Sequence, residues 1–164
     1  SENLYIEEAN EETSHFKLLR NLGRAADMSD EEIEHPQPLP STAVAMAAWE
    51  GLTKSRPWLE GLAAKAVLER FNDPASGVKP GSKAMMDVLR ARFGLTGEAL
   101  GFHEVHAVAD LEHGSMGYEL IHRHIDDGTT TIDRVATAAR TSAEAFRLMT
   151  DGWVEHCRAQ KKRS

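Results

Sequence analysis

The stretch FHEVHAVADLEHG, residues 102–114, places His106, Asp110 and His113 at offsets of four and seven residues. On a helix these offsets fall along one stripe, so the three side chains project from the same face. Imidazole and carboxylate groups together form a ligand set that suits iron, manganese or zinc. The stretch therefore predicts a helix that carries half of a metal site.

Helical spacing of apolar residues continues on both sides of this stretch and predicts an all-α protein, since the sequence contains no alternating strand pattern. Thr13 or Ser14 can cap a helix that begins at His15 and ends near Gly23. An acidic connection with three prolines and one short helical turn follows, over residues 27–40. Later helices are predicted from Ser41 or Thr42, from Arg56-Pro57, over 83–93 with Gly94 as the end, from Thr96 or Gly97 to about 126–128, and from Ile132 to Trp153.

The chain has 164 residues, which is enough for one domain with one core. We therefore expect residues 1–164 to form a single helical bundle domain. The first residues read as the middle of a helix with no capping residue, and this predicts that the N-terminal helices of the bundle are missing from this chain. We expect the tryptophans and several methionines to lie in the core, namely Trp49, Trp58, Trp153, Met85, Met86 and Met149.

Charge and cysteine content exclude several classes of function. A formal net charge of -7 argues against nucleic acid as a partner, because binding to the phosphate backbone requires a basic face. Cys157 is the only cysteine, so the sequence contains no disulfide framework, as expected in a reducing compartment. There is no run of about 20 apolar residues and no basic, apolar leader. We therefore expect a cytoplasmic protein with no membrane partner.

Glu69 ends an otherwise small and apolar helix, on the face that carries Leu62 and Ala66. A carboxylate in such a position is unfavourable unless it is paired, hydrogen-bonded or bound to a cation. The alternative interpretation is a charge at the end of a helix that approaches solvent. Spacing alone does not decide between these two readings, and it does not select Glu7, Glu8 or His15 within their acidic surroundings.

Three segments in order, NLYIEE (3–8) followed by His15, then GLAAKAVLE (61–69), then HAVADLEH (106–113), resemble the haem-oxygenase-like diiron oxidases and oxygenases. These are helical relatives of the pyrroloquinoline-quinone biosynthesis C proteins and thiaminase II. The resemblance extends from Asn3 to about Trp153. It implies a haem-oxygenase-like helical bundle that binds two ferrous ions and uses O2 as a cosubstrate. The metal ligands that it implies are Glu7 or Glu8, His15, Glu69, His106, Asp110 and His113.

Counting from Asn3 selects Glu7 as the first ligand, whereas counting back from His15 selects Glu8. Both therefore stay candidates. The resemblance implies that the metal centre itself is catalytic and that the substrate is a small amine, amino acid or fatty acid. The reaction would be N-oxygenation or oxidative carbon–carbon cleavage. Leu68 stands where the self-sacrificing aminobenzoate-forming members have tyrosine, which disfavours that variant.

Two other classes of function stay open at this point. The first is a metal-free protein of the same fold that binds a small molecule or takes part in cofactor biosynthesis. The second is a non-enzymatic helical interaction module whose histidines are ordinary polar residues. A small-molecule substrate is the expected partner, and a homodimer is a possible assembly.

Overall fold

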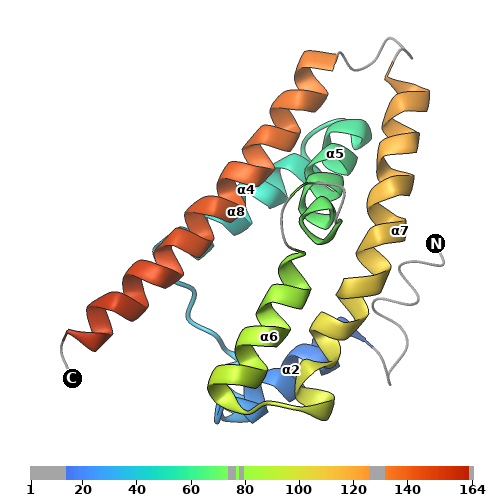
Figure 1. The fold of residues 1–164 in the computed structure, drawn as a ribbon. Coiled ribbons are helices and arrows are strands. Elements are labelled where there is room, and N and C mark those ends of the chain that lie inside the picture. The colour runs from blue at the N-terminus through green and yellow to red at the C-terminus, as the bar shows by residue number, and fades with distance from the viewer. Residues whose placement is uncertain (1–13, 74–76, 78–79, 126–131, 163–164) are drawn as a thin grey trace. The chain divides into compact units, whose positions relative to one another are not determined.

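The computed structural model describes residues 14–73, 77, 80–125 and 132–162, with only the backbone described for residues 109–114. Within these residues every regular element is a helix (Figure 1), which confirms the predicted all-α class. The elements are α2 (His15–Ala25), α3 (Asp30–Glu34), α4 (Pro40–Lys54), α5 (Trp58–Glu69), the 3-10 helix η2 (Arg70–Asn72), α6 (Gly81–Phe93), the 3-10 helix η4 (Gly97–Leu100), α7 (Gly101–His124) and α8 (Ile132–Lys161).

The chain divides into two compact units. Unit 1 comprises residues 1–37 and 74–110, and unit 2 comprises residues 38–73 and 111–164. Helix α7 begins in unit 1 and ends in unit 2. The expectation of a single domain therefore stays a prediction. None of the helices in the described residues is both long and apolar enough to cross a membrane.

In unit 1, α2 packs against η4 and the start of α7. Leu100 at the end of η4 is fully buried. A Cβ atom on Gly101 would lie 3.1 Å from Cδ2 of Leu18, so the first turn of α7 passes close to α2. An ion pair of 3.1 Å between Arg90 and Glu104 joins α6 to the first turns of α7. These contacts fix the position of the first turns of α7 relative to the start of α2.

The sequence predicted the start of α2 more closely than its end. Ser14 caps the helix by accepting a hydrogen bond of 3.3 Å from the backbone N–H of Lys17, as predicted. The helix ends close to the predicted position, since α2 continues past Gly23 to Ala25. A Cβ atom on Gly23 would lie 2.9 Å from the side chain of Ile33. This glycine therefore permits the close approach of α3 and does not terminate the helix.

Local signals set several other helix ends. Ser29 and Glu32 form a reciprocal capping box at the start of α3, which is the short helical turn predicted within the acidic connection. Gly94 ends α6 in the left-handed conformation with φ 67°, as predicted. Helix α4 begins at Pro40, one or two residues before the predicted start, because proline is favourable in the first turn.

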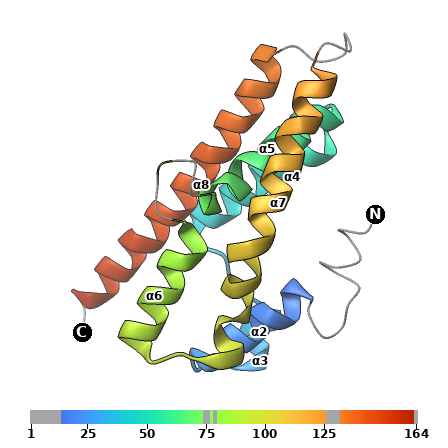
Figure 2. The ribbon, with the colours of Figure 1, turned by 45° about the vertical axis from the view of Figure 1, so that its right-hand side comes forward.

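Unit 2 is built from α4, α5, the later turns of α7, and α8. The views in Figures 1 and 2 both show α8 running alongside α4 and α5, which are its main contacts. One core cluster joins α5, α7 and α8 through Leu59, Ala63, Ala66, Ile121 and Val135. Gly117 of α7 lies against α5, where a Cβ atom would come within 2.9 Å of the Cβ of Ala66. Small side chains at this point allow α5 and α7 to approach closely.

A chain of two hydrogen bonds joins three helices of unit 2. The indole N–H of Trp49 in α4 donates to Ser142 Oγ of α8 over 3.0 Å. The hydroxyl of Ser142 in turn donates to the backbone carbonyl of Ala64 in α5 over 2.7 Å. Ser142 is fully buried, and its hydroxyl both accepts one of these hydrogen bonds and donates the other.

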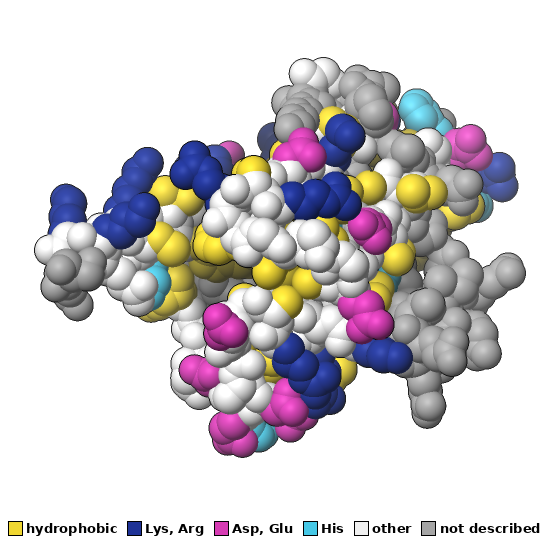
Figure 3. Space-filling view, turned by 60° about the horizontal axis from the view of Figure 1, so that its bottom comes forward, with side chains coloured by type: hydrophobic (Ala, Val, Ile, Leu, Met, Phe, Trp, Pro, Cys, Tyr) yellow, Lys and Arg dark blue, Asp and Glu magenta, His cyan; other side chains and the backbone are white. Residues whose placement is uncertain are grey.

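Not every predicted core residue is buried. Met86 and Met149 are, but Trp58, Trp153 and Met85 are 54%, 43% and 45% exposed, so the prediction was wrong for these three. The exposed tryptophans have local partners. The indole N–H of Trp153 donates to Thr42 Oγ1 over 3.0 Å, and the ring of Trp58 packs edge-on against His124 at 5.5 Å. The last turn of α8 carries the basic residues Arg158 and Lys161. Figure 3 shows basic side chains in dark blue at this end of the chain.

Candidate metal-binding site

Unit 1 brings together two of the predicted metal ligands. His15 is the first residue of α2, and His106 lies in the second turn of α7. Their imidazole ring centroids are 4.5 Å apart, with an angle of 46° between the ring planes. Both residues are half-buried. Two imidazole side chains from distant parts of the sequence therefore lie side by side.

The ring of Phe102 packs against both histidines. Its centroid lies 4.1 Å from that of His106 and 5.8 Å from that of His15. An aromatic wall of this kind excludes water from one side of the imidazole pair and lowers the local dielectric constant. Interactions of the imidazole nitrogens with a cation are stronger in such surroundings than in water.

His106 is oriented by its own helix. Its Nδ1–H donates to the backbone carbonyl of Phe102, with an Nδ1 to oxygen distance of 2.7 Å. A carbonyl oxygen only accepts hydrogen bonds, so the proton of the neutral ring is on Nδ1 and the lone pair is on Nε2. Histidines that bind metals usually donate their second ring N–H to a carbonyl or carboxylate in this way. The arrangement at His106 therefore fits a metal ligand that binds through Nε2.

His103, one turn before His106, is also half-buried. Burial, and to a lesser extent the positive charge of a protonated His106, lowers the pKa of the His103 imidazole below its usual value. The ring of His103 lies edge-on to Phe102, with 5.4 Å between the centroids. The surroundings of the imidazole pair therefore disfavour the protonated form of His103.

Glu69 lies in unit 2 at the end of α5. Its side chain is 12% exposed and its Oε1 lies 3.2 Å from Nζ of Lys65, one turn earlier. The reading of Glu69 as a charge in solvent is therefore wrong, because the carboxylate is largely enclosed. Its charge is balanced within its own helix by a lysine whose side chain is 51% exposed.

The other predicted ligands lie outside what the structure describes. Glu7 and Glu8 precede the described residues, and the side chains of Asp110 and His113 are not described. The backbone of α7 is continuous over both of these positions, which keeps the helical spacing from His106. Among the described residues, no group of three or more His, Cys, Asp or Glu side chains is placed to hold a metal ion.

Sequence reasoning missed a second polar site, in unit 2. Glu60 in the first turn of α5 is only 4% exposed, and its Oε1 lies 2.6 Å from Nη2 of Arg134 in α8. This buried oxygen makes the ion pair without a well-aligned hydrogen bond among the described residues. Acidic residues are common and solvated in first helical turns, so the sequence offers no signal for this burial beyond the small residues that follow Glu60.

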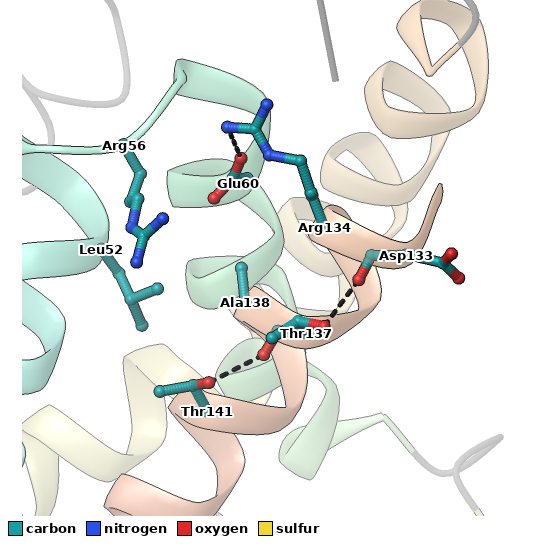
Figure 4. Close-up of a pocket in the computed structure, with 8 residues that line it drawn as sticks. All are labelled: Leu52, Arg56, Glu60, Asp133, Arg134, Thr137, Ala138 and Thr141. Carbon is teal, nitrogen blue, oxygen red and sulfur yellow. Dashed lines mark hydrogen bonds and ion pairs between the residues drawn. The ribbon is translucent and has the colours of Figure 1, made fainter. Parts of the chain in front are cut away.

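The Glu60–Arg134 pair borders a cleft of about 250 Å³ between α4, α5 and α8 (Figure 4). The residues that line it are Leu52, Arg56, Glu60, Asp133, Arg134, Thr137, Ala138 and Thr141. Its walls therefore combine two arginines, the buried carboxylate of Glu60 and the exposed acidic residue Asp133 with hydroxyl and apolar groups.

Comparison with known protein families gives a match over most of the chain. Residues 1–147 match a family that is described as iron-containing redox enzymes. No curated protein and no solved structure matches the chain. The match covers most of the sequence, including both histidines of the imidazole pair and Glu69. The chain therefore belongs to this haem-oxygenase-like family of iron-containing redox enzymes.

Proposed function

We propose that this chain is a non-haem diiron oxidase or oxygenase that uses O2 to oxidise a small amine, amino acid or fatty acid. Membership of an iron-containing redox family supports the oxidoreductase class. The observation that carries the proposal further is the juxtaposition of His15 and His106 at 4.5 Å, together with the hydrogen bond that leaves Nε2 of His106 available as a ligand atom.

In this proposal His15 and His106 supply imidazole ligands. The resemblance adds Glu7 or Glu8, Glu69, Asp110 and His113. Carboxylate and imidazole together are the ligand set of non-haem ferrous sites with open coordination positions. When bound, a pair of ferrous ions supplies the electrons that activate O2.

The chain's own groups prepare the site in two ways. The carbonyl of Phe102 fixes the ring orientation and the tautomer of His106, so no reorganisation of this ligand is needed when a cation binds. Lys65 lies 3.2 Å from Glu69 and its side chain is half exposed, so its ammonium group can turn to solvent when a cation binds the carboxylate.

Iron content after anaerobic loading with Fe²⁺ and desalting tests the proposal. Elemental analysis should find about two irons per chain, as expected for a site built from imidazoles and several carboxylates. Iron-free protein after loading would contradict the proposal and favour a metal-free member of the fold. Oxygen uptake by the loaded protein, measured with amines, amino acids and fatty acids in turn, then identifies the substrate class that accelerates it.

A further inference from the structure

The cleft between α4, α5 and α8 has the features of a ligand site that the proposed iron chemistry does not use. Its volume of about 250 Å³ is slightly below the range of pockets for drug-sized ligands, so it fits a small molecule. Arg56 comes from the turn between α4 and α5, and its side chain extends along the cleft wall toward Leu52 (Figure 4). Thr137, Ala138 and Thr141 form the opposite wall on successive turns of α8.

The charges of the cleft favour an anion. Arg134 is paired with the buried carboxylate of Glu60 at 2.6 Å, so these two charges balance. The carboxylate of Asp133 points away from the cleft (Figure 4). Within the described residues, Arg56 makes no hydrogen bond or ion pair with another side chain, and it contributes one uncompensated positive charge. A guanidinium group binds a carboxylate through two parallel N–H donors.

The other lining groups narrow the class of anion. The hydroxyl of Thr141 donates its proton to the carbonyl of Thr137 over 2.9 Å, so its oxygen can bind a ligand only as an acceptor. The hydroxyl of Thr137 likewise donates to the carbonyl of Asp133 over 2.7 Å. Leu52 and Ala138 supply a buried apolar surface. A ligand that matches all three kinds of group has a carboxylate, a neighbouring hydroxyl donor and a short apolar chain.

We propose that this cleft binds a small hydroxycarboxylate, with its carboxylate on Arg56, its hydroxyl on Thr141 and its alkyl group over Leu52 and Ala138. The site lies within unit 2 and uses none of the proposed iron ligands. Its test uses iron-free protein, so its outcome and that of the iron proposal are independent.

Isothermal titration calorimetry of the full chain with 2-hydroxybutanoate should show saturable binding. Butanoate, which lacks the hydroxyl, should bind more weakly, and the neutral 2-hydroxybutanamide should bind more weakly still. Replacement of a charged hydrogen-bond partner typically weakens an interaction by about 1.5–3 kcal/mol, so Arg56→Gln should weaken 2-hydroxybutanoate binding by about tenfold or more. Arg92→Gln is the matched control, because Arg92 is an exposed arginine of α6 in unit 1.

A second variant tests the hydroxyl contact. Thr141→Val should reduce the affinity for 2-hydroxybutanoate to that for butanoate and leave the affinity for butanoate unchanged. The proposal is overturned if 2-hydroxybutanoate does not saturate the wild-type protein, if Arg56→Gln binds it as tightly as Arg92→Gln does, or if the neutral amide binds as tightly as the acid. Retention of the preference for the hydroxy acid in Thr141→Val would also overturn the assignment.

Discussion

The imidazole ring of His15, at the first position of α2, lies 4.5 Å from the ring of His106 in α7. The contact depends on three local features. Ser14 caps the helix that presents His15, the approach of α2 to η4 places this cap beside α7, and the Phe102 carbonyl orients His106. The aromatic ring of Phe102 packs against the imidazole of His106 and meets that of His15 edge-on. An imidazole pair that is oriented before a cation arrives loses little conformational freedom on binding.

Loss of either imidazole should lower iron binding. We expect His106→Ala and His15→Ala to retain less iron than the wild type after anaerobic Fe²⁺ loading and desalting, because each removes a nitrogen ligand. His122→Ala is the control, since His122 is an exposed histidine on the same helix as His106. Elemental analysis measures the iron, and far-UV circular dichroism confirms that each variant is folded. Equal iron content in His106→Ala and His122→Ala would contradict the assignment.

Replacement of Gly117 by alanine should lower the free energy of unfolding, because α5 lies very close to α7 at this position. A Cβ atom there would lie 2.9 Å from the Cβ of Ala66, and overpacking of this kind typically reduces stability by about 1–3 kcal/mol. Gly51 of α4 is the matched control, because no atom lies within 4 Å of the corresponding position. Gly51→Ala should raise the free energy of unfolding slightly, by about 0.5–1 kcal/mol, since alanine favours a helix over glycine.

Urea denaturation of the two alanine variants measures this difference. The double variant Gly117→Ala with Ala66→Gly should recover part of the loss, because it removes the methyl group that collides. If Gly117→Ala proves as stable as Gly51→Ala, the close approach of α5 and α7 at this point is not a packing constraint.

Ser142→Ala should destabilise unit 2 although it changes only one buried atom. The substitution leaves the Trp49 indole N–H without its acceptor and the Ala64 carbonyl without its hydroxyl donor. Buried polar groups that lose a partner typically reduce stability by about 1–3 kcal/mol. Trp49→Phe removes the donor instead, so a double-mutant cycle with Ser142→Ala isolates the coupling between the two residues. Additive effects in denaturant unfolding would show that the hydrogen bond contributes nothing.

The capping box of α3 should respond to pH. The carboxylate of Glu32 accepts hydrogen bonds from the side-chain hydroxyl and from the backbone N–H of Ser29. Both lower the pKa of Glu32 below the ordinary value of 4.5, and the hydroxyl has the larger effect. A carboxyl group whose pKa is depressed by folding stabilises the folded form above the ordinary pKa and loses this effect as the pH falls through the depressed pKa. The helical structure of α3 should therefore weaken in that acidic range.

Carboxyl ¹³C chemical shifts, followed by NMR as a function of pH, give the titration midpoint of Glu32. In Ser29→Ala the midpoint should move upward, because the hydroxyl donor is lost. Ser55→Ala, at the exposed C-terminal end of α4, is the control and should leave the Glu32 midpoint in place. An unchanged midpoint in Ser29→Ala would show that the capping box does not set this pKa.

Within a few residues, the sequence alone determined most of the helices. The Ser14 cap, the left-handed Gly94 and the helical backbone of α7 through residues 106–113 depend on residues one or two turns apart. Local backbone preferences and side-chain spacing therefore suffice to predict them. The order of the three motifs also predicted the family, which the match over residues 1–147 confirms.

Tertiary structure decided what each helix face contacts. The enclosure of Glu69, the burial of Glu60 beside Arg134 and the close approach at Gly117 all depend on which distant helix packs against α5. Trp58 was expected in the core by residue type, yet the packing leaves it more than half exposed. The juxtaposition of His15 and His106 likewise required α2 to pack against η4. Burial and ion pairing are properties of side chains that meet across the fold, and the spacing within one helix carries no information about its partner.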